Sequence, residues 1–567
     1  MSAVFRCLWL GVLVVAVRAG VPVRVEPVMG KNGMVVAGHP QAAEAGWAVL
    51  QAGGNAIDAA VATSLALGVA EPYGSGLGGK LMLLYYEAKT GRIYAVDAMD
   101  AAGSVDPAKY LGQPVEERGT GYASVCVPGL AAGLWTAHQR WGQSPWAAAV
   151  QPAIDLARQG FRILPKTREQ FAEQERKLRR GDREIARLYL PAGALPEVGT
   201  ILANEDLART MEALARQGRD GFYRGPIAEA IATASRRGGG WLTLADLAGY
   251  EARVGDPVTL TFRGYTLFSG PPPTSGSALF FPILKALEKE TFDGGPLRRA
   301  ANLDRIGRVW RAAHPAIGRA VGDVPESRFL FEKLIAPDAI EDLRARAFGP
   351  PGARRKVARL DGSDAESPFY ESAMAATTHF AVADRAGNVV CATQSQSLHF
   401  GAGVVPPGTG VVMNNSMSNF STTDPANPNY VAPGRRPRST IGPTIVLQRG
   451  RPVLAIGIPG SARIPTALLQ ALLDRLALNR PLAEAIGDTR VHFLSPLRSG
   501  EPDAFEAEQS FPAVEAEALR ALGWKVVLRE AAGTGRYFGG INAIEFRPDG
   551  TMVGYADPRR TNAAKGF

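Results

Sequence analysis

Residues 375–390 have the sequence Ala375-Ala376-Thr377-Thr378-His379-Phe380-Ala381-Val382-Ala383-Asp384-Arg385-Ala386-Gly387-Asn388-Val389-Val390. An alternating apolar run follows the Thr pair, and a turn signal separates it from a second apolar run. This pattern predicts a β-hairpin whose first strand begins at a hydroxyl residue. Once the bond before it is cleaved, such a Thr carries its own base, because its free α-amine can take the proton of its hydroxyl. Thr377 is therefore either an ordinary strand residue or a nucleophile.

The composition is that of an ordinary globular protein. The 567 residues are 46% hydrophobic and 21% charged, and they can form more than one domain. The net charge of +9 is modest for this length. Because no run of Lys and Arg is interleaved with aromatic residues, we expect no nucleic-acid partner.

The amino terminus resembles a secretory signal. Residues 4–17 are apolar except for Arg6, and Arg18, Ala19 and Gly20 follow. This pattern predicts a signal peptide at residues 1–19 that is removed after Ala19. The apolar stretch is too short for a convincing membrane span, so we expect an exported protein, periplasmic or extracellular, without stable membrane association. An uncleaved membrane anchor is the alternative.

Cysteine and histidine usage predicts no metal and no cofactor. Cys7 would leave with the signal peptide, while Cys126 and Cys391 lie in apolar runs typical of buried segments. One disulfide between these two remains open. The six His residues show no metal-ligand spacing with one another or with Cys.

The order of predicted elements indicates a mixed fold. Helices are predicted at Pro40–Ala70, through much of 145–239, and at Pro465–Leu476 and Ala513–Leu522, with a hairpin at Leu81–Tyr86 and Arg92–Val96. Residues 349–376 have the composition of an exposed linker, which suits a self-processing site. Gly74–Gly79 satisfies the G-x-G-x-x-G pattern, but a helix precedes it and a strand follows. Because a dinucleotide site needs the opposite order, we exclude one.

Several different short motifs are spaced along the chain. They are Gly53-Gly54-Asn55-Ala56-Ile57-Asp58-Ala59-Ala60, Gly76-Leu77-Gly78-Gly79, Val127-Pro128-Gly129-Leu130, Arg263-Gly264-Tyr265, Pro271-Pro272-Pro273-Thr274-Ser275-Gly276, Thr377-Thr378-His379-Phe380, Asn414-Asn415, Arg436-Pro437-Arg438-Ser439-Thr440, Gly457-Ile458-Pro459-Gly460 and Tyr555-Ala556-Asp557-Pro558-Arg559-Arg560. From about Gly30 to Phe567 the chain thereby resembles the γ-glutamyltransferase (glutathione hydrolase) family of N-terminal-nucleophile hydrolases. The resemblance implies an α+β fold, a four-layer αββα sandwich. It also implies self-cleavage before Thr377 into a large subunit (20–376) and a small subunit (377–567), which together form one heterodimeric fold.

The resemblance also implies catalytic roles. Thr377 aligns with the nucleophile, and Ser395 aligns with a Thr whose hydroxyl supports it. Gly460 and Ser461 align with the residues whose N–H groups stabilise the oxyanion of the tetrahedral intermediate. Ser461 departs from the family, which usually has Gly there.

The aligned acyl-binding residues differ from those of the family. Met99 and Asp100 occupy the positions of an Arg-Glu pair whose Arg binds the γ-glutamyl carboxylate, and Met cannot supply that bidentate cation. Ser397 and Ser416 replace amides and Asn419 replaces an Asp, while Ser439 and Thr440 are retained. Losing both charged groups removes roughly two or more orders of magnitude of γ-glutamyl affinity. We hypothesise that Arg438 supplies a compensating cation, the alternative being a surface Arg in a basic loop.

Three functions are consistent with these residues. The first is a self-processing enzyme that cleaves γ-glutamyl amides such as glutathione, with altered recognition of the acyl group. The second is an acylase of the same fold for glutaryl or cephalosporin-type side chains, which carry no α-amine. The third is a catalytically idle relative that binds a ligand or a partner.

Overall fold

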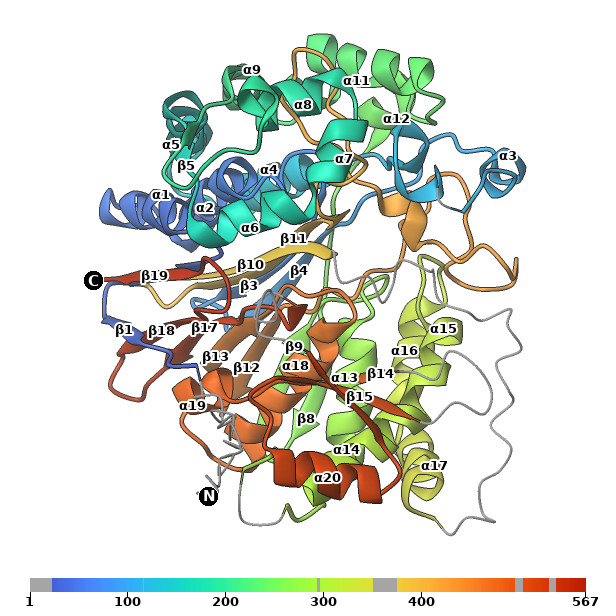
Figure 1. The fold of residues 1–567 in the computed structure, drawn as a ribbon. Helices are drawn as coiled ribbons and strands as arrows, with labels where there is room; N and C mark the ends of the chain where they lie inside the picture. Colours follow the sequence, from blue (N-terminus) through green and yellow to red (C-terminus); the bar gives the residue numbers. More distant parts are fainter. Residues whose placement is uncertain (1–22, 116, 293–295, 350–374, 495–502, 530–536) are drawn as a thin grey trace, which may run out of the picture.

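The computed structural model describes residues 23–115, 117–292, 296–349, 375–494, 503–529 and 537–567. The predicted signal peptide and nearly all of the predicted linker lie outside these ranges. Within them, no helix is both long and apolar enough to cross a membrane. Two seven-stranded sheets lie face to face at the centre, each covered on its outer side by helices (Figure 1).

The first sheet contains Thr377, and we call it the nucleophile sheet. Its strands follow the order β19 (Ala563–Gly566), β2 (Gly33–Ala37), β10 (Ala375–Asp384), β11 (Val389–Leu398), β3 (Lys80–Glu87), β4 (Arg92–Ala98) and β7 (Arg253–Gly255). The second sheet has the order β1 (Pro27–Gly30), β18 (Met552–Ala556), β17 (Asn542–Phe546), β13 (Arg451–Gly457), β12 (Thr444–Gln448), β9 (Tyr265–Ser269) and β8 (Val258–Phe262). Each sheet combines strands from both sides of Thr377, so the two predicted subunits share one fold.

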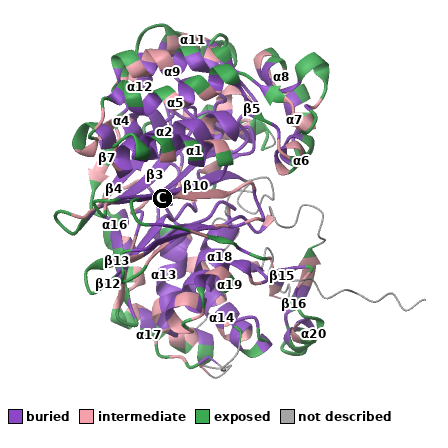
Figure 2. Cartoon of the chain, turned by 90° about the vertical axis from the view of Figure 1, so that its left-hand side faces the viewer, coloured by how far each residue is buried: buried purple, intermediate pink, exposed green. Residues whose placement is uncertain are grey.

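Both faces of the nucleophile sheet are buried. Along β3, Met82 and Leu84 point toward the second sheet, whereas Leu81, Leu83 and Tyr85 point toward the helices. Because successive strand residues alternate between faces, an almost continuous apolar run serves both layers. Figure 2 shows this buried centre between partly exposed outer helices.

The outer helices complete the four layers. The nucleophile sheet is covered by α1 (Pro40–Gln51), α2 (Ala56–Ala70), α4 (Leu130–Trp141), α5 (Trp146–Gln159) and α9 (Glu205–Gln217), and the second sheet by α13 (Gly276–Leu287), α14 (Ala300–Ala313), α17 (Pro337–Phe348) and α18 (Arg463–Leu472). Peripheral elements are α3 (Pro107–Leu111), α6 (Pro165–Glu173), α7 (Glu175–Arg180), α8 (Arg183–Tyr189), α10 (Asp220–Tyr223), α11 (Gly225–Arg237), α12 (Leu244–Gly249), α15 (Ile317–Ala320), α16 (Ser327–Leu334), α19 (Leu482–Gly487), α20 (Ala513–Ala521), the pair β5 (Phe161–Arg162) and β6 (Ile201–Leu202), and the small sheet β14 (Val491–Leu494), β15 (Ala504–Glu508) and β16 (Lys525–Arg529). The predicted αββα sandwich is confirmed.

The single helix predicted at Pro40–Ala70 is wrong in one respect, because the structure divides it into α1 and α2. Gly53, with φ +93°, lies beyond the end of α1 in the left-handed region, and Asn55 caps α2. The side chain of Asn55 accepts the N–H of Asp58, whose carboxylate accepts the N–H of Asn55 in return. This reciprocal capping fixes a new helix start.

The predicted hairpins at 81–96 and 375–390 are confirmed as β3–β4 and β10–β11. Gly74–Gly79 lies between α2 and β3, the order that excluded a dinucleotide site. Cys126 and Cys391 are both buried free thiols, which answers the question of a disulfide between them.

Candidate active site

Thr377 lies at an irregularity in the hairpin. Ala376 pairs with Ser397 and Thr378 pairs with Gln394, so the register between β10 and β11 shifts at Thr377. Such bulges redirect a side chain and are frequent beside active sites. The Thr377 side chain reaches a cavity although only 4% of the residue is exposed.

Ser395 on β11 lies beside the bond that precedes Thr377. Its Oγ is 3.1 Å from the Oγ1 of Thr377 and donates to the carbonyl oxygen of Ala376 at 2.5 Å. The Thr377 hydroxyl also donates to that carbonyl. The chain is continuous through Ala376 and Thr377 in this structure. Two hydroxyls thus converge on the carbonyl that a self-cleaving nucleophile must attack.

Buried charged residues lie beside the backbone of Thr377. The guanidinium of Arg560 donates to the carbonyl oxygen of Thr377 at 3.1 Å. Glu71 accepts from the hydroxyls of Tyr73 at 3.1 Å and Thr561 at 3.3 Å. Burial raises the pKa of the Glu71 carboxyl, and the Thr378 hydroxyl and Arg560 oppose that rise.

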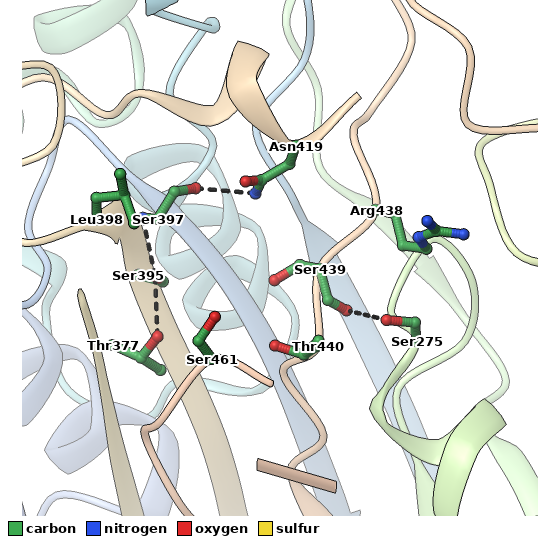
Figure 3. A pocket seen from close by; sticks show the side chains of 10 residues that line it. All are labelled: Ser275, Thr377, Ser395, Ser397, Leu398, Asn419, Arg438, Ser439, Thr440 and Ser461. Carbon is green, nitrogen blue, oxygen red and sulfur yellow. Dashed lines mark hydrogen bonds between the residues drawn. The ribbon is translucent and has the colours of Figure 1, made fainter. Parts of the chain in front are cut away.

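The cavity beside Thr377 is rich in hydroxyl groups (Figure 3). Its described lining consists of Ser275, Thr377, Ser395, Ser397, Leu398, Asn419, Arg438, Ser439, Thr440 and Ser461. Of the predicted site residues, seven besides Thr377 therefore meet at one place. Among the described lining residues, Arg438 carries the one charge and none is a carboxylate.

The predicted oxyanion loop connects β13 to α18. Gly460 has φ +152° and Ser461 has φ +52°, so Ser461 adopts the left-handed conformation in which Gly is preferred. A Ser is tolerated there at a cost of about 1 kcal/mol. Ser461 faces the same cavity as Thr377, and it has a backbone N–H group just as Gly would.

Two predicted acyl-binding residues lie away from the described lining. Met99 is fully buried in the core between the sheets, and its carbonyl oxygen accepts the hydroxyl of Tyr250 at 2.6 Å. Ser416 is also buried, and its hydroxyl donates to Asp100. The aligned position of the family Arg is thus a packing position here.

Arg438 lines the cavity, but its guanidinium is directed away from Thr377 in Figure 3. Its Nη1 donates to the carbonyl oxygen of Ile317 at 3.4 Å, and its backbone N–H donates to Asn429. The half-buried side chain therefore borders the outer part of the cavity.

Sequence reasoning missed a buried cation beside the cavity, Lys80, at the start of β3. Its side chain is 1% exposed, and its Nζ lies 2.5 Å from the Oγ of Ser397, 2.7 Å from the Oγ of Ser416 and 3.4 Å from Asp100. Burial raises the pKa of Asp100 to about 6, opposed by Lys80 and Ser416. A charged residue directly after the glycine run and before an apolar strand was the available signal.

Comparisons with known proteins identify the family of this chain. A family model described as Gamma-glutamyltranspeptidase matches residues 42–567. The chain is 35% identical to the Acylase ACY 1 proenzyme of Pseudomonas sp. (strain SE83), over 94% of this chain and 93% of that protein. It is 31% identical to the Glutathione hydrolase proenzyme of Bacillus subtilis (strain 168), over 95% and 92%.

The fold is similar to a solved structure, that of a cephalosporin acylase from Bacillus halodurans. It superposes with a TM-score of 0.84 at 27% identity, covering 96% of this chain and 98% of the other. Fold and sequence agree: the chain is an enzyme of the gamma-glutamyltranspeptidase family of N-terminal-nucleophile hydrolases.

Proposed function

We propose that this protein is an exported, self-processing amidase that cleaves acyl amides through an acyl-enzyme on Thr377. The observation that carries the proposal is the convergence of the Thr377 and Ser395 hydroxyls on the carbonyl of Ala376. Attack by Thr377 Oγ1 on that carbonyl transfers the acyl group from nitrogen to oxygen. Water then hydrolyses the ester, which releases the 20–376 chain and leaves a free α-amine on Thr377.

The same groups would then serve the external substrate. The α-amine takes the proton of the Thr377 hydroxyl as the oxygen attacks the amide carbonyl, and the proton passes to the departing amine. The N–H groups of Gly460 and Ser461 would stabilise the oxyanion. Water, or an acceptor amine, releases the acyl group from Thr377.

The described cavity lining favours an acyl group without an ammonium. The lining hydroxyls and amide can hold a carboxylate or a carbonyl, but the described lining has no carboxylate to bind an α-ammonium. Glutaryl-type amides, which end in a carboxylate and lack the amine, fit this surface best. The Acylase ACY 1 relative adds support.

A γ-glutamyl amide such as glutathione is the second candidate. Ser439 and Thr440 are retained at the cavity, and relatives named Glutathione hydrolase proenzyme match most of the chain. The missing carboxylate predicts a weaker reaction with this class than with glutaryl amides.

Intact mass and amino-terminal sequencing of the purified protein test the proposal. We expect chains of about 38 and about 20 kDa, in proportion to their lengths, the smaller starting at Thr377. Thr377→Ala should remain one chain. An uncut wild-type chain that is stable for days would contradict the proposal and favour a catalytically idle relative.

Glutaryl-, γ-glutamyl- and acetyl-p-nitroanilide then separate the substrate classes. Release of p-nitroaniline from the glutaryl compound at a higher kcat/KM than from the γ-glutamyl compound supports the first candidate. The reverse order supports the second.

A further inference from the structure

We infer that Lys80 is the cation that selects the acyl group, acting through the hydroxyl of Ser397 on a carboxylate held in the cavity. This inference rests on the proposed amidase function and names the substrate class: amides of ω-carboxyacyl groups that carry no α-ammonium. Lys80 then replaces, from a different strand, the charge that Met99 cannot supply.

The sheet register places Lys80 beside the catalytic hydroxyls. Lys80 on β3 pairs with Ser395 on β11, so the two side chains project from the same face of the nucleophile sheet. Ser397 lies two residues further along β11, and its hydroxyl oxygen is 2.5 Å from Lys80 Nζ. The ammonium therefore lies in the layer between the sheets, one hydroxyl away from the cavity.

The hydrogen bonds around Ser397 orient its hydroxyl. A hydroxyl can accept two hydrogen bonds and donate one. Ser397 Oγ accepts from Lys80 Nζ at 2.5 Å and from Asn419 Nδ2 at 3.1 Å. Because Ser416 donates its own hydrogen to Asp100, Ser397 donates to Ser416, 2.8 Å away, and a carboxylate in the cavity would compete for that hydrogen. Ser397 thus offers the ligand a hydrogen-bond donor that an ammonium ion polarises, which suits a carboxylate.

Asp100 forms an ion pair with Lys80 and is not among the described residues that line the cavity. Its carboxylate is fully buried, 3.4 Å from the ammonium, and accepts the hydroxyl of Ser416. The ammonium thus contacts a lining residue, Ser397, whereas the carboxylate contacts the buried Ser416. Because Ser397 has φ +77°, the strand end is held in a conformation unusual for a non-glycine residue.

The experiment compares glutaryl-p-nitroanilide with its carboxamide analogue, in which the far carboxylate becomes an uncharged amide of nearly equal size. For the wild type we expect kcat/KM to favour the carboxylate about 100-fold. The double variant Lys80→Gln/Asp100→Asn removes both buried charges together and should reduce that ratio to about threefold or less. Asp100→Asn alone is the matched control, because it alters the same pair but keeps the ammonium, and its ratio should stay at about 100-fold or more.

One result would overturn the inference: a double variant that keeps the wild-type ratio. If both kcat/KM values stay high, the discriminating cation lies elsewhere, and if both decline in parallel, Lys80 serves only the structure.

A binding measurement keeps the test independent of turnover. We expect glutarate to raise the Tm of the wild type and of Asp100→Asn by about 2 °C, with no effect of glutaramide and no response of the double variant. Glutarate stabilising the double variant as well as the wild type would refute the role of Lys80. An uncleaved wild-type chain that nonetheless responds to glutarate would refute the amidase function alone.

If the double variant does not fold, Lys80→Arg is used, and an unchanged preference for the carboxylate is expected because the charge remains. Loss of the preference in folded, processed Lys80→Arg would count against the inference.

Discussion

The hydroxyl oxygen of Ser395 lies 3.1 Å from the hydroxyl oxygen of Thr377, and both hydroxyls bond to the carbonyl of Ala376. In the proposed self-cleavage, Ser395 would polarise the carbonyl of Ala376 that Thr377 attacks. Ser395→Ala removes that donor and should slow the appearance of the two chains by about 10- to 100-fold. A time course of purified precursor on denaturing gels measures this rate.

Ser395→Thr is the control for the Ser395 prediction, since it keeps the hydroxyl that the family has at this position. It should process within about threefold of the wild type. Equal processing by the Ala and Thr variants would show that the short contact with Ala376 is not used.

Asn419→Asp should shift specificity toward substrates that carry an ammonium. The new carboxylate would lie beside Ser397 in a cavity whose described lining otherwise has no acidic group. We expect kcat/KM for γ-glutamyl-p-nitroanilide to rise about 10-fold and that for glutaryl-p-nitroanilide to fall by a similar factor. Asn419→Ser, which is uncharged, should leave the ratio of the two unchanged, and a rise for both substrates would contradict the explanation.

Arg438→Ala should change kcat/KM for glutaryl-p-nitroanilide by less than about threefold, because the guanidinium bonds to Ile317 and is directed away from Thr377. Steady-state kinetics of the processed variant measure this. A loss near 100-fold, confined to substrates with a carboxylate, would instead support the compensating role hypothesised from the sequence.

The hairpin at Thr377 is predictable from the sequence because its signals are local, whereas the four-layer sandwich is predicted by the family resemblance. Alternating residues on either side of the turn at Asp384–Asn388 specify β10 and β11. Gly78 and Gly79, after α2, lie too close to neighbouring backbone for a side chain. A Cβ on Gly79 would lie 2.4 Å from the carbonyl oxygen of Ser395, so only glycine fits beside the catalytic strand.

The acyl pocket was predicted less well, because an alignment shows which residue occupies a position but not which side chains surround it in this fold. Met99 aligns with a ligand-binding Arg, yet in this fold its side chain packs in the core. Lys80 and Ser397 are 317 residues apart and meet only through the pairing of β3 with β11. No local pattern around Lys80 reveals that contact.

Ser461→Gly tests the oxyanion loop. Glycine adopts φ +52° without steric cost and keeps the N–H group, so we expect kcat within about threefold and unfolding stability unchanged or raised by up to about 1 kcal/mol. Ser461→Val places a β-branched side chain in the left-handed region and should lower both stability and activity. Thermal melts and steady-state kinetics measure both variants. A Val variant as stable and active as the Gly variant would argue against this backbone conformation.

Two buried histidines should make the protein sensitive to mild acid. Burial lowers the pKa of His379 to about 3 and that of His39 to about 4, so both are neutral in the folded protein. The unfolded chain binds their protons near the ordinary pKa of 6.5, so the stability that they contribute is complete above that value. The contribution of each histidine to stability declines as the pH falls toward 3–4. Between pH 7 and pH 5 each contribution should decrease by about 2 kcal/mol. The raised pKa of Asp100, to about 6, acts in the opposite direction over this range. The net loss of stability is therefore smaller than the sum of the losses from the two histidines, and comparison of a histidine variant with the wild type isolates that histidine's share.

His379→Gln can keep a hydrogen bond to Thr393 without a titrating group. Urea unfolding at pH 7 and pH 5 should show about 2 kcal/mol less acid destabilisation in this variant than in the wild type. The same pH dependence in both would mean that His379 remains neutral in the unfolded chain or becomes protonated in the folded one.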